Sequence, residues 1–296
     1  MNNKLKFTII NTALVCLLSL PNISFSKTTN NKHYGLYISG QYKPSVSVFS
    51  SFSVKETNVI TKNLIALKKD VDSIETKSDA SVGISNPGNF TIPYTAVFED
   101  NAVNFNGTIG YTFVEGTRVE VEGSYEEFDV KDPGGYTKIK DAYRYFALAR
   151  EMNSNTNKFE PKEKINSGTN TIYHTVMRND GLSITSVIIN VCYDFSLNNL
   201  LVSPYICGGV GVDAIEFFDV LHIKFAHQSK LGITYSLPSN ISLFAGLYYH
   251  KVMGNQFKNL DVQHVAKLAT APPITSAVAT LNIGYFGGEI GARLTF

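Results

Sequence analysis

Seven charged side chains recur at alternate positions in segments that are otherwise apolar or small. They are Arg118, Glu120, Glu122, Asp194, Lys230, Glu289 and Arg293. Side chains two positions apart in a β-strand lie on the same face, so this spacing directs the charges to one surface of a sheet. Because an unpaired buried charge is costly, a closed sheet would have to pair them inside. Two roles follow: a polar lumen that passes small solutes, or a plug of ion pairs that fills the interior.

Cys192 and Cys207 lie on the same predicted inward faces, on adjacent strands joined by a hairpin near residues 198–200. This places the two cysteines nearly opposite each other. An exported location permits oxidation, so we expect a cross-strand disulfide where the Cα separation allows one. Two free thiols packed as small apolar groups are an alternative, and intermolecular cross-linking is another.

No catalytic or metal-binding set emerges from the other polar residues. The six histidines lack a metal-ligand spacing such as H-E-x-x-H. Residues 208–211 read GGVG, but they lie within a predicted strand that no helix follows, so they do not form a phosphate-binding loop. His222 and Asp219 lack the geometry of an active site. We therefore predict that the protein is not an enzyme and has no metal or cofactor.

Eight segments show the period-two alternation of strands. They span residues 34–42, 104–113, 117–128, 182–195, 201–212, 223–237, 240–251 and 281–296. Most are about ten residues or longer, the length that a tilted strand needs to cross a bilayer. The pattern predicts an all-β fold, an antiparallel transmembrane β-barrel of eight strands, whose interior is just wide enough for side chains.

A wider pore would need more strands, for which three segments are candidates. These are residues 91–98, 141–150 and 171–177. Residues 141–152 could instead form a short amphipathic helix.

Short and long connections alternate along the chain. Residues 114–116, 196–200 and 238–239 are short turns, and external loops are expected at 43–103, 129–181, 213–222 and 252–280. Outer-membrane barrels have short turns in the periplasm and long loops outside. A soluble lipocalin-like barrel is the main alternative, but it has no physical reason to keep that alternation.

The amino-terminal residues 1–26 predict a secretory signal peptide. A basic start at Lys4 and Lys6 precedes a short apolar run, and small residues precede Lys27. Residues 27–296 are then the barrel domain. The chain has 26 Lys and Arg against 25 Asp and Glu, which indicates no nucleic-acid partner.

The carboxyl terminus carries a second export signal. Gly291, Leu294 and Phe296 resemble the ending by which barrel-assembly machinery recognises bacterial outer-membrane proteins. An apolar face that alternates with a charged face in this last strand agrees with a barrel in outer-membrane lipid.

Several motifs resemble one known family. They cover residues 37–45, 52–56, 141–145, 192–194, 203–207, 230–232, 250–252 and 285–296. Together they resemble the major surface antigen family of the Ehrlichia and Anaplasma type. The resemblance implies an immunodominant outer-membrane protein, exposed on the surface of an obligate intracellular bacterium, with loops that differ between paralogues. It also implies passive porin activity for small hydrophilic solutes.

Two functions therefore remain open from the sequence. The first, a passive porin for small hydrophilic solutes, is the predicted function, since the family resemblance supports it. The second is a closed barrel whose loops 43–103 and 129–181 contact the host-cell surface or antibodies, since connections of this length are rare in compact domains. An oligomer is compatible with either function.

Overall fold

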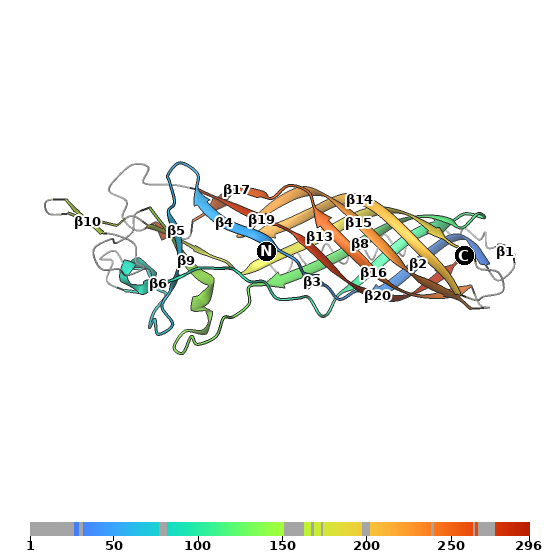
Figure 1. Cartoon of the computed structure of the whole chain (residues 1–296), viewed down its shortest axis with the longest axis horizontal. Helices are drawn as coiled ribbons and strands as arrows, with labels where there is room; N and C mark the ends of the chain where they lie inside the picture. Colours follow the sequence, from blue (N-terminus) through green and yellow to red (C-terminus); the bar gives the residue numbers. More distant parts are fainter. Residues whose placement is uncertain are drawn as a thin grey trace.

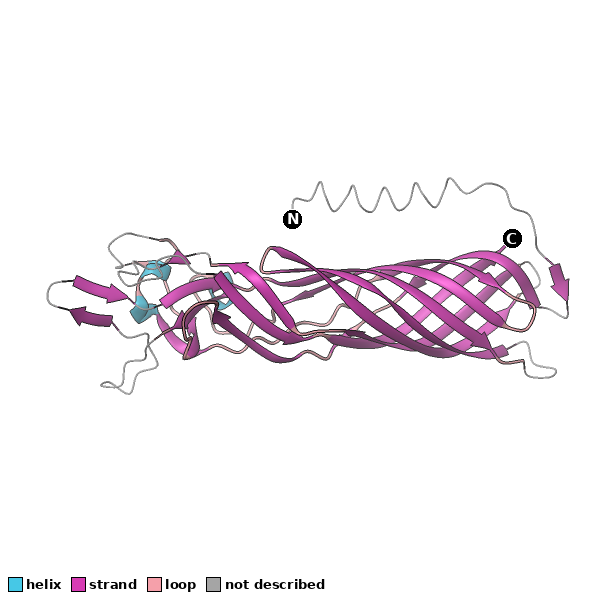
Figure 2. Ribbon diagram, turned by 90° about the horizontal axis from the view of Figure 1, so that it is seen from above, coloured by secondary structure: helices cyan, strands magenta, loops and turns pink. Residues whose placement is uncertain are grey.

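The computed structural model describes most of the chain. The described residues are 27–29, 32–76, 82–150, 163–166, 169–172, 174–196, 202–237, 240–262, 264–265 and 276–296. They form an elongated barrel with a β-structured head at one end (Figures 1 and 2). The predicted signal peptide at 1–26, the turn at 238–239 and most of the turn at 196–200 lie outside the described residues.

Eight long strands close the barrel. They are β2 (Lys32–Tyr42), β7 (Phe105–Thr112), β8 (Thr117–Asp129), β13 (Gly181–Asp194), β14 (Val202–Phe217), β15 (Val220–Ser236), β16 (Ile241–Val252) and β20 (Gly284–Thr295). Each pairs antiparallel with the next, and β2 pairs with β20 to complete the cylinder. A short strand, β1 (Lys27–Thr29), pairs with β2. The predicted fold, an eight-stranded antiparallel transmembrane barrel, is confirmed.

The barrel wall is apolar outside and polar inside over most of its length. On β13, Val187, Ile189 and Val191 are exposed on the outer face, whereas the alternate residues Asn190 and Cys192 are buried. Exposing large apolar side chains to water is unfavourable, whereas contact of the same side chains with lipid is favourable. Within the described residues, no helix is long and apolar enough to span a membrane.

Aromatic side chains gather at both ends of the apolar band. Tyr193 and Phe195 are in contact near the short turns, with ring centroids 5.0 Å apart. Near the head, the rings of Tyr42 and Phe105 lie 5.5 Å apart. Amphipathic rings favour the interface between lipid and water, so these pairs mark the two edges of the membrane-spanning part.

The polarity of the wall reverses towards the head. On β14 the outward Val210 and Val212 are exposed, but further along it is the inward Ile215 and Phe217 that are apolar and buried. Between them, Glu216 occupies the outward position. The strands therefore continue beyond the lipid, where their outer face meets water and their inner face packs on the head.

This reversal corrects the prediction of an external loop at 213–222, which was wrong. These residues belong to β14 and β15, apart from a two-residue turn at Phe218 and Asp219. Both turn residues have positive φ, 53° and 60°, as in the tight turns that match strand twist. After Val212 the apolar side chains of β14 lie on the inner face of the wall. The outward apolar alternation therefore ends at Val212, although the strand continues to Phe217.

The barrel wall is extended by a smaller sheet. Its strands are β4 (Ser50–Glu56), β19 (Ser276–Asn282) and β17 (Gln256–Asp261), in the order β17–β19–β4. Only Ile283 separates β19 from β20. A further short strand, β3 (Val46–Ser47), pairs with β20. The predicted loops 43–103 and 252–280 thus contain strands that begin as continuations of the barrel.

The head contains a five-stranded sheet far from the membrane. Its strands are β18 (His264–Val265), β12 (His174–Arg178), β9 (Tyr145–Ala149), β5 (Asn63–Leu67) and β6 (Phe90–Pro93), in that order. The hairpin of β10 (Glu163–Asn166) and β11 (Thr169–Ile172) forms a separate sheet. The 3₁₀ turns η1 (Gly83–Ser85), η2 (Pro87–Asn89) and η3 (Lys140–Arg144) complete the described elements.

The candidate extra barrel strands belong to this head. Residues 91–98, 141–150 and 171–177 overlap β6, β9 and β12, which pair within the five-stranded sheet and not with the barrel. The alternative of an amphipathic helix at 141–152 is replaced by η3 followed by β9. The barrel therefore keeps eight strands.

The five-stranded sheet has an apolar core on each of its faces. Phe146 and Leu148 of β9 point into a cluster that reaches down to Phe217 inside the outer end of the barrel. Tyr145 and Ala147 point into a second cluster on the distal face. Because both faces of β9 are buried, the head is fastened to the barrel by apolar packing.

Candidate functional site in the barrel lumen

The structure brings all seven predicted charged residues together inside the barrel. Arg118, Glu120 and Glu122 come from β8, Asp194 from β13, Lys230 from β15, and Glu289 and Arg293 from β20. All are buried except Asp194, whose side chain is 13% exposed. We call this set, together with Lys43, the lumen network.

Glu122 is the centre of the lumen network. Its carboxylate contacts the ammonium groups of both Lys230 and Lys43, and Lys43 Nζ lies 2.5 Å from Glu122 Oε1. Lys230 Nζ also lies 3.4 Å from Glu289 and 3.6 Å from Glu120. Each lysine is thus buried against at least one carboxylate, which offsets the cost of taking both charges out of water.

A second group of pairs lies nearer the short turns. Arg118 Nε is 2.9 Å from Asp194 Oδ2, and Arg118 Nη1 is 3.5 Å from Glu120 Oε2. The hydroxyl of Tyr37 donates a hydrogen bond of 2.5 Å to Glu120. Neutral amides fill the spaces between the pairs, because Asn190 Nδ2 donates to both Glu120 and Glu122 at 3.3 and 3.4 Å.

Lys43 is a lumen residue that was not predicted. The apolar alternation ends at Tyr42, which places Lys43 at the start of a predicted external loop. The opposite parity continues, however: Gln41, Lys43 and Ser45 are all buried inside. The signal that identifies Lys43 is this polar alternation, which extends beyond the last lipid-facing residue.

Glu126 continues the inward face of β8 above the lumen network. Its carboxylate accepts hydrogen bonds from Ser45, Asn101 and Asn104. Ser45 and Asn101 belong to the predicted loop 43–103, which therefore reaches into the barrel.

Little free space is left in the middle of the lumen. The cavity among Gln41, Glu120, Lys230 and Arg293 is about 10 Å³. That is about the minimum needed to hold one water molecule. Towards the head, the apolar cluster around Phe217 and Tyr285 occupies the interior. The described side chains of the lumen network and of this apolar cluster therefore pack with little space between them.

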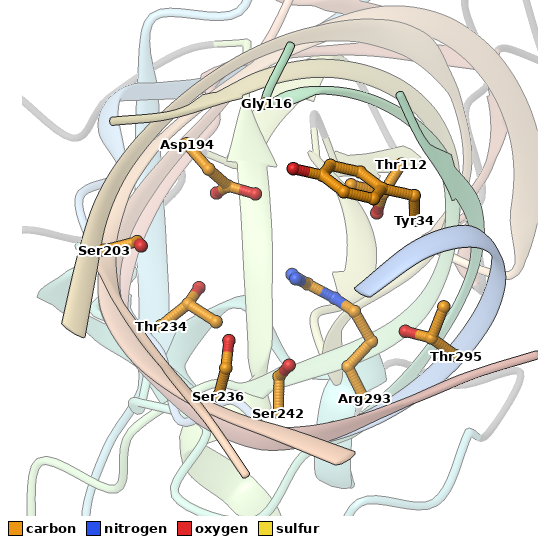
Figure 3. A pocket seen from close by; sticks show the side chains of 10 residues that line it. All are labelled: Tyr34, Thr112, Gly116, Asp194, Ser203, Thr234, Ser236, Ser242, Arg293 and Thr295. Carbon is orange, nitrogen blue, oxygen red and sulfur yellow. The ribbon is translucent and has the colours of Figure 1, made fainter. Parts of the chain in front are cut away.

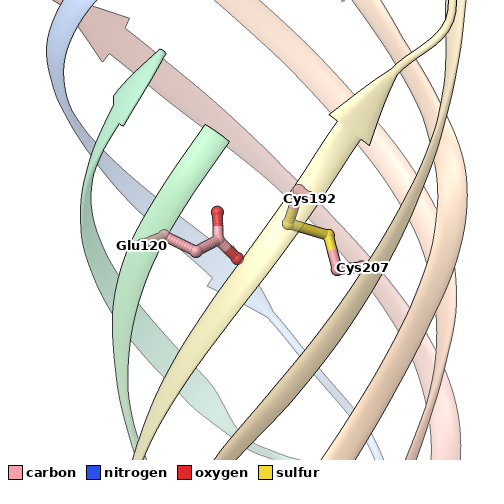
Figure 4. A group of neighbouring side chains, drawn as sticks. All are labelled: Glu120, Cys192 and Cys207. Atoms are coloured by element: carbon pink, nitrogen blue, oxygen red, sulfur yellow. A yellow bond between two sulfur atoms is a disulfide. The ribbon is translucent and has the colours of Figure 1, made fainter. Parts of the chain in front are cut away.

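The structure joins Cys192 and Cys207 by a disulfide (Figure 4). The two residues are directly paired across β13 and β14, with Cα atoms 4.0 Å apart. Glu120 lies beside the sulfur atoms, but bonded sulfurs offer no thiolate to a metal ion. The disulfide links the strands that carry Asp194 and Tyr205, and so supports the wall behind the lumen network.

The residues of the carboxyl-terminal signal lie on both faces of β20. Leu294 and Phe296 face outward and are each 39% exposed. Gly291 faces inward, where an added Cβ would lie 2.5 Å from the ring of Phe244 and 2.6 Å from the Gly40 carbonyl oxygen. Glycine at 291 thus lets β20 approach β2 closely at the seam of the barrel.

Outside the membrane, a buried ion pair joins the three-stranded sheet to the five-stranded sheet, because Glu56 ends β4 and Arg150 directly follows β9. We call these the two sheets of the head. Arg150 Nε and Nη2 donate to the two carboxylate oxygens of Glu56 at 2.6 and 2.9 Å. Thr175 Oγ1 donates to the same carboxylate at 3.0 Å. Nearby, burial raises the pKa of Tyr94 above its ordinary value, so its hydroxyl stays neutral as it accepts a hydrogen bond from Asn179.

Comparison with known proteins identifies the family of this chain. The sequence profile of the family described as "Surface antigen" matches residues 29–296. Major surface antigen 4 of Anaplasma marginale is 30% identical over 263 residues, which are 88% of this chain and 83% of that protein.

Two solved outer-membrane or surface proteins are also similar. OprG from Pseudomonas aeruginosa has 13% identity and a TM-score of 0.47, with 89% of this chain and 97% of that chain covered. Neisserial surface protein A has 12% identity and a TM-score of 0.39, with 88% and 97% covered. On the profile match and the curated relative, this chain belongs to the surface antigen family and is a barrel exposed on the surface of the bacterial outer membrane.

Proposed function

We propose that the protein is a closed outer-membrane barrel that presents its β-structured head to host cells and antibodies. The observation that carries this proposal is the filled interior. Paired charges occupy the membrane-spanning part, and an apolar core occupies the outer part. A barrel built in this way is a rigid support, and the surface available for function is the head.

The construction of the head supports display. Its central strand β9 is buried on both faces, and the Glu56–Arg150 pair ties its two sheets together. Ile60, between β4 and β5, is 79% exposed although the strands on either side are anchored. Fixed sheets with exposed connections give a partner a preformed surface, which lowers the entropic cost of binding.

The other parts of the proposal follow from the barrel. Its apolar outer face contacts outer-membrane lipid, and the barrel-assembly machinery recognises the ending that contains Gly291, Leu294 and Phe296. The proposal includes no catalytic step and no cofactor.

A passive porin is the second candidate function. The charges of both signs in the lumen favour it, since they would solvate small hydrophilic solutes. In this structure, however, conduction would require Glu122 to release Lys43 and Lys230 and the head core to separate from the barrel. The packing of the described residues therefore supports the closed barrel over the porin.

A headless variant tests display. Ser47 donates to Asp100 at 2.8 Å and Asp129 pairs with Gly181, so short Gly-Ser linkers can replace 48–97 and 131–178 and leave the barrel strands intact. We expect this variant, expressed on a surrogate bacterium, to lose most host-cell and immune-serum binding.

As a control, an epitope tag is placed after Asn58 in the intact protein and in the first linker of the variant. Binding is compared at equal surface amounts of the two proteins, measured through the tag, and heat-modifiable migration verifies that both barrels are folded. Equal host-cell and serum binding by the two proteins would contradict the proposal.

A further inference from the structure

The end of the barrel opposite the head contains a small vestibule, beside Gly116 of the turn 114–116 (Figure 3). Its volume is about 40 Å³. Hydroxyl side chains surround it, including Thr234, Ser236 and Ser242. Arg293 and Asp194 extend into it from opposite sides (Figure 3). The short turns of outer-membrane barrels face the periplasm, so the vestibule opens to that compartment.

Arg293 differs from the other cations of the lumen network. Lys43, Lys230 and Arg118 each contact a carboxylate. Arg293 has no ion pair among the described residues, and its Nε atom has no hydrogen-bond partner there, although the residue is only 6% exposed. A buried guanidinium N–H without an acceptor is costly, which favours a ligand that accepts a hydrogen bond from it.

Two aromatic rings lie beside the guanidinium of Arg293. The guanidinium carbon of Arg293 lies 4.7 Å from the centroid of the Tyr37 ring and 5.5 Å from that of Phe244. Both distances are within the range of cation–π contacts. The Nε–H of Arg293 has no hydrogen-bond partner among the described residues, and the edge of a guanidinium matches the two oxygens of a carboxylate.

The carboxylate of Asp194 limits how much negative charge a ligand in the vestibule can carry. Its Oδ2 atom is paired with Arg118, whereas Oδ1 has no hydrogen-bond partner among the described residues. This carboxylate faces the same vestibule and repels a second negative charge. A monoanion therefore fits better than a dianion such as inorganic phosphate.

We infer that the periplasmic vestibule binds a carboxylate group, held by the edge of Arg293 and by the surrounding hydroxyls. The group can come from a free small acid or from the carboxyl terminus of a peptide. Both sources offer the same planar monoanion, and the vestibule is open on the periplasmic side to either.

The test uses the folded full-length protein in detergent micelles, labelled with ¹⁵N-arginine, and follows the Nε–Hε resonances by NMR. We expect acetate to shift the Arg293 resonance saturably, whereas acetamide, its neutral analogue, leaves it unchanged. Gly-Gly is compared with amidated Gly-Gly: a shift with the free dipeptide at lower concentration than with acetate identifies a peptide as the source. A shift with acetate at lower concentration than with Gly-Gly identifies a free acid as the source.

Two variants complete the test. Arg293→Gln should weaken acetate binding about tenfold or more, since the bidentate charge-assisted contact is lost; binding to this variant is followed through the Nε–Hε resonance of the neighbouring Arg118. Arg144→Gln, which removes an equal charge in the head, should leave acetate binding unchanged. If Arg293→Gln does not fold, the comparison of acetate with acetamide on the unaltered protein still decides. Equal shifts with both compounds, unchanged binding in Arg293→Gln, or tighter binding of inorganic phosphate than of acetate would each overturn the inference.

Discussion

Replacing Glu122 by glutamine should lower the free energy of unfolding of the barrel by about 3–5 kcal/mol, the usual cost of removing one partner from a buried ion pair. The substitution keeps the size of the side chain but removes the charge that Lys43 and Lys230 share. Lys230 retains Glu120 and Glu289 as neighbours, whereas Lys43 loses its only carboxylate contact among the described residues. The loss is therefore large because it leaves a buried ammonium group unpaired.

Urea unfolding of the refolded protein in detergent, followed by circular dichroism, measures this effect. Glu127→Gln is the matched control, since Glu127 lies on the same strand but is exposed. We expect the control to change the free energy of unfolding by less than about 0.5 kcal/mol. A double variant, Glu122→Gln with Lys43→Met, should recover part of the loss. Equal effects of Glu122→Gln and Glu127→Gln would mean that the lumen network does not stabilise the barrel.

The second large effect is expected in the head. Arg150→Met leaves the Glu56 carboxylate buried, with only Thr175 to donate to it among the described residues. We expect local opening of the head to become easier by about 3–5 kcal/mol, while the barrel strands stay protected. Hydrogen exchange measured by mass spectrometry should show faster exchange in β4, β9 and β12 than in β13 and β14.

Arg144→Met is the control for this change. Arg144 contacts Asp180 at 3.1 Å, but the aspartate is 45% exposed, and pairs of this kind contribute about 0–1 kcal/mol. Exchange in the head should therefore stay close to that of the unaltered protein. If Arg150→Met exchanged no faster than Arg144→Met, the Glu56–Arg150 pair would not be what holds the two sheets together.

The barrel could be predicted from the sequence because its strands have different solvents on their two faces. Lipid outside and paired charges inside produce strict alternation, as in Val119 and Val121 against Arg118 and Glu120. The parity of the alternation also identified the inward charges and the facing cysteines. The alternation did not identify Lys43, because the outward apolar residues end at Tyr42 while inward polar side chains continue at Lys43 and Ser45.

The head could not be predicted in this way. The five residues of β9 are all buried, so neither face carries the polar residues that produce alternation. Its sheet also joins segments distant in the chain, such as β5 with β9 and β12 with β18. Such pairings leave no local signal, and the reversal after Val212 removes the signal even from a long barrel strand.

The closed lumen is the claim on which the proposed function depends, and planar-bilayer recording tests it directly. Refolded protein should insert without stepwise conductance, since the lumen network and the head core fill the interior. A variant with Lys43, Glu122 and Lys230 all replaced by alanine provides the comparison, because it removes the centre of the network. Reproducible conductance steps from the unaltered protein would contradict the closed barrel and restore the porin.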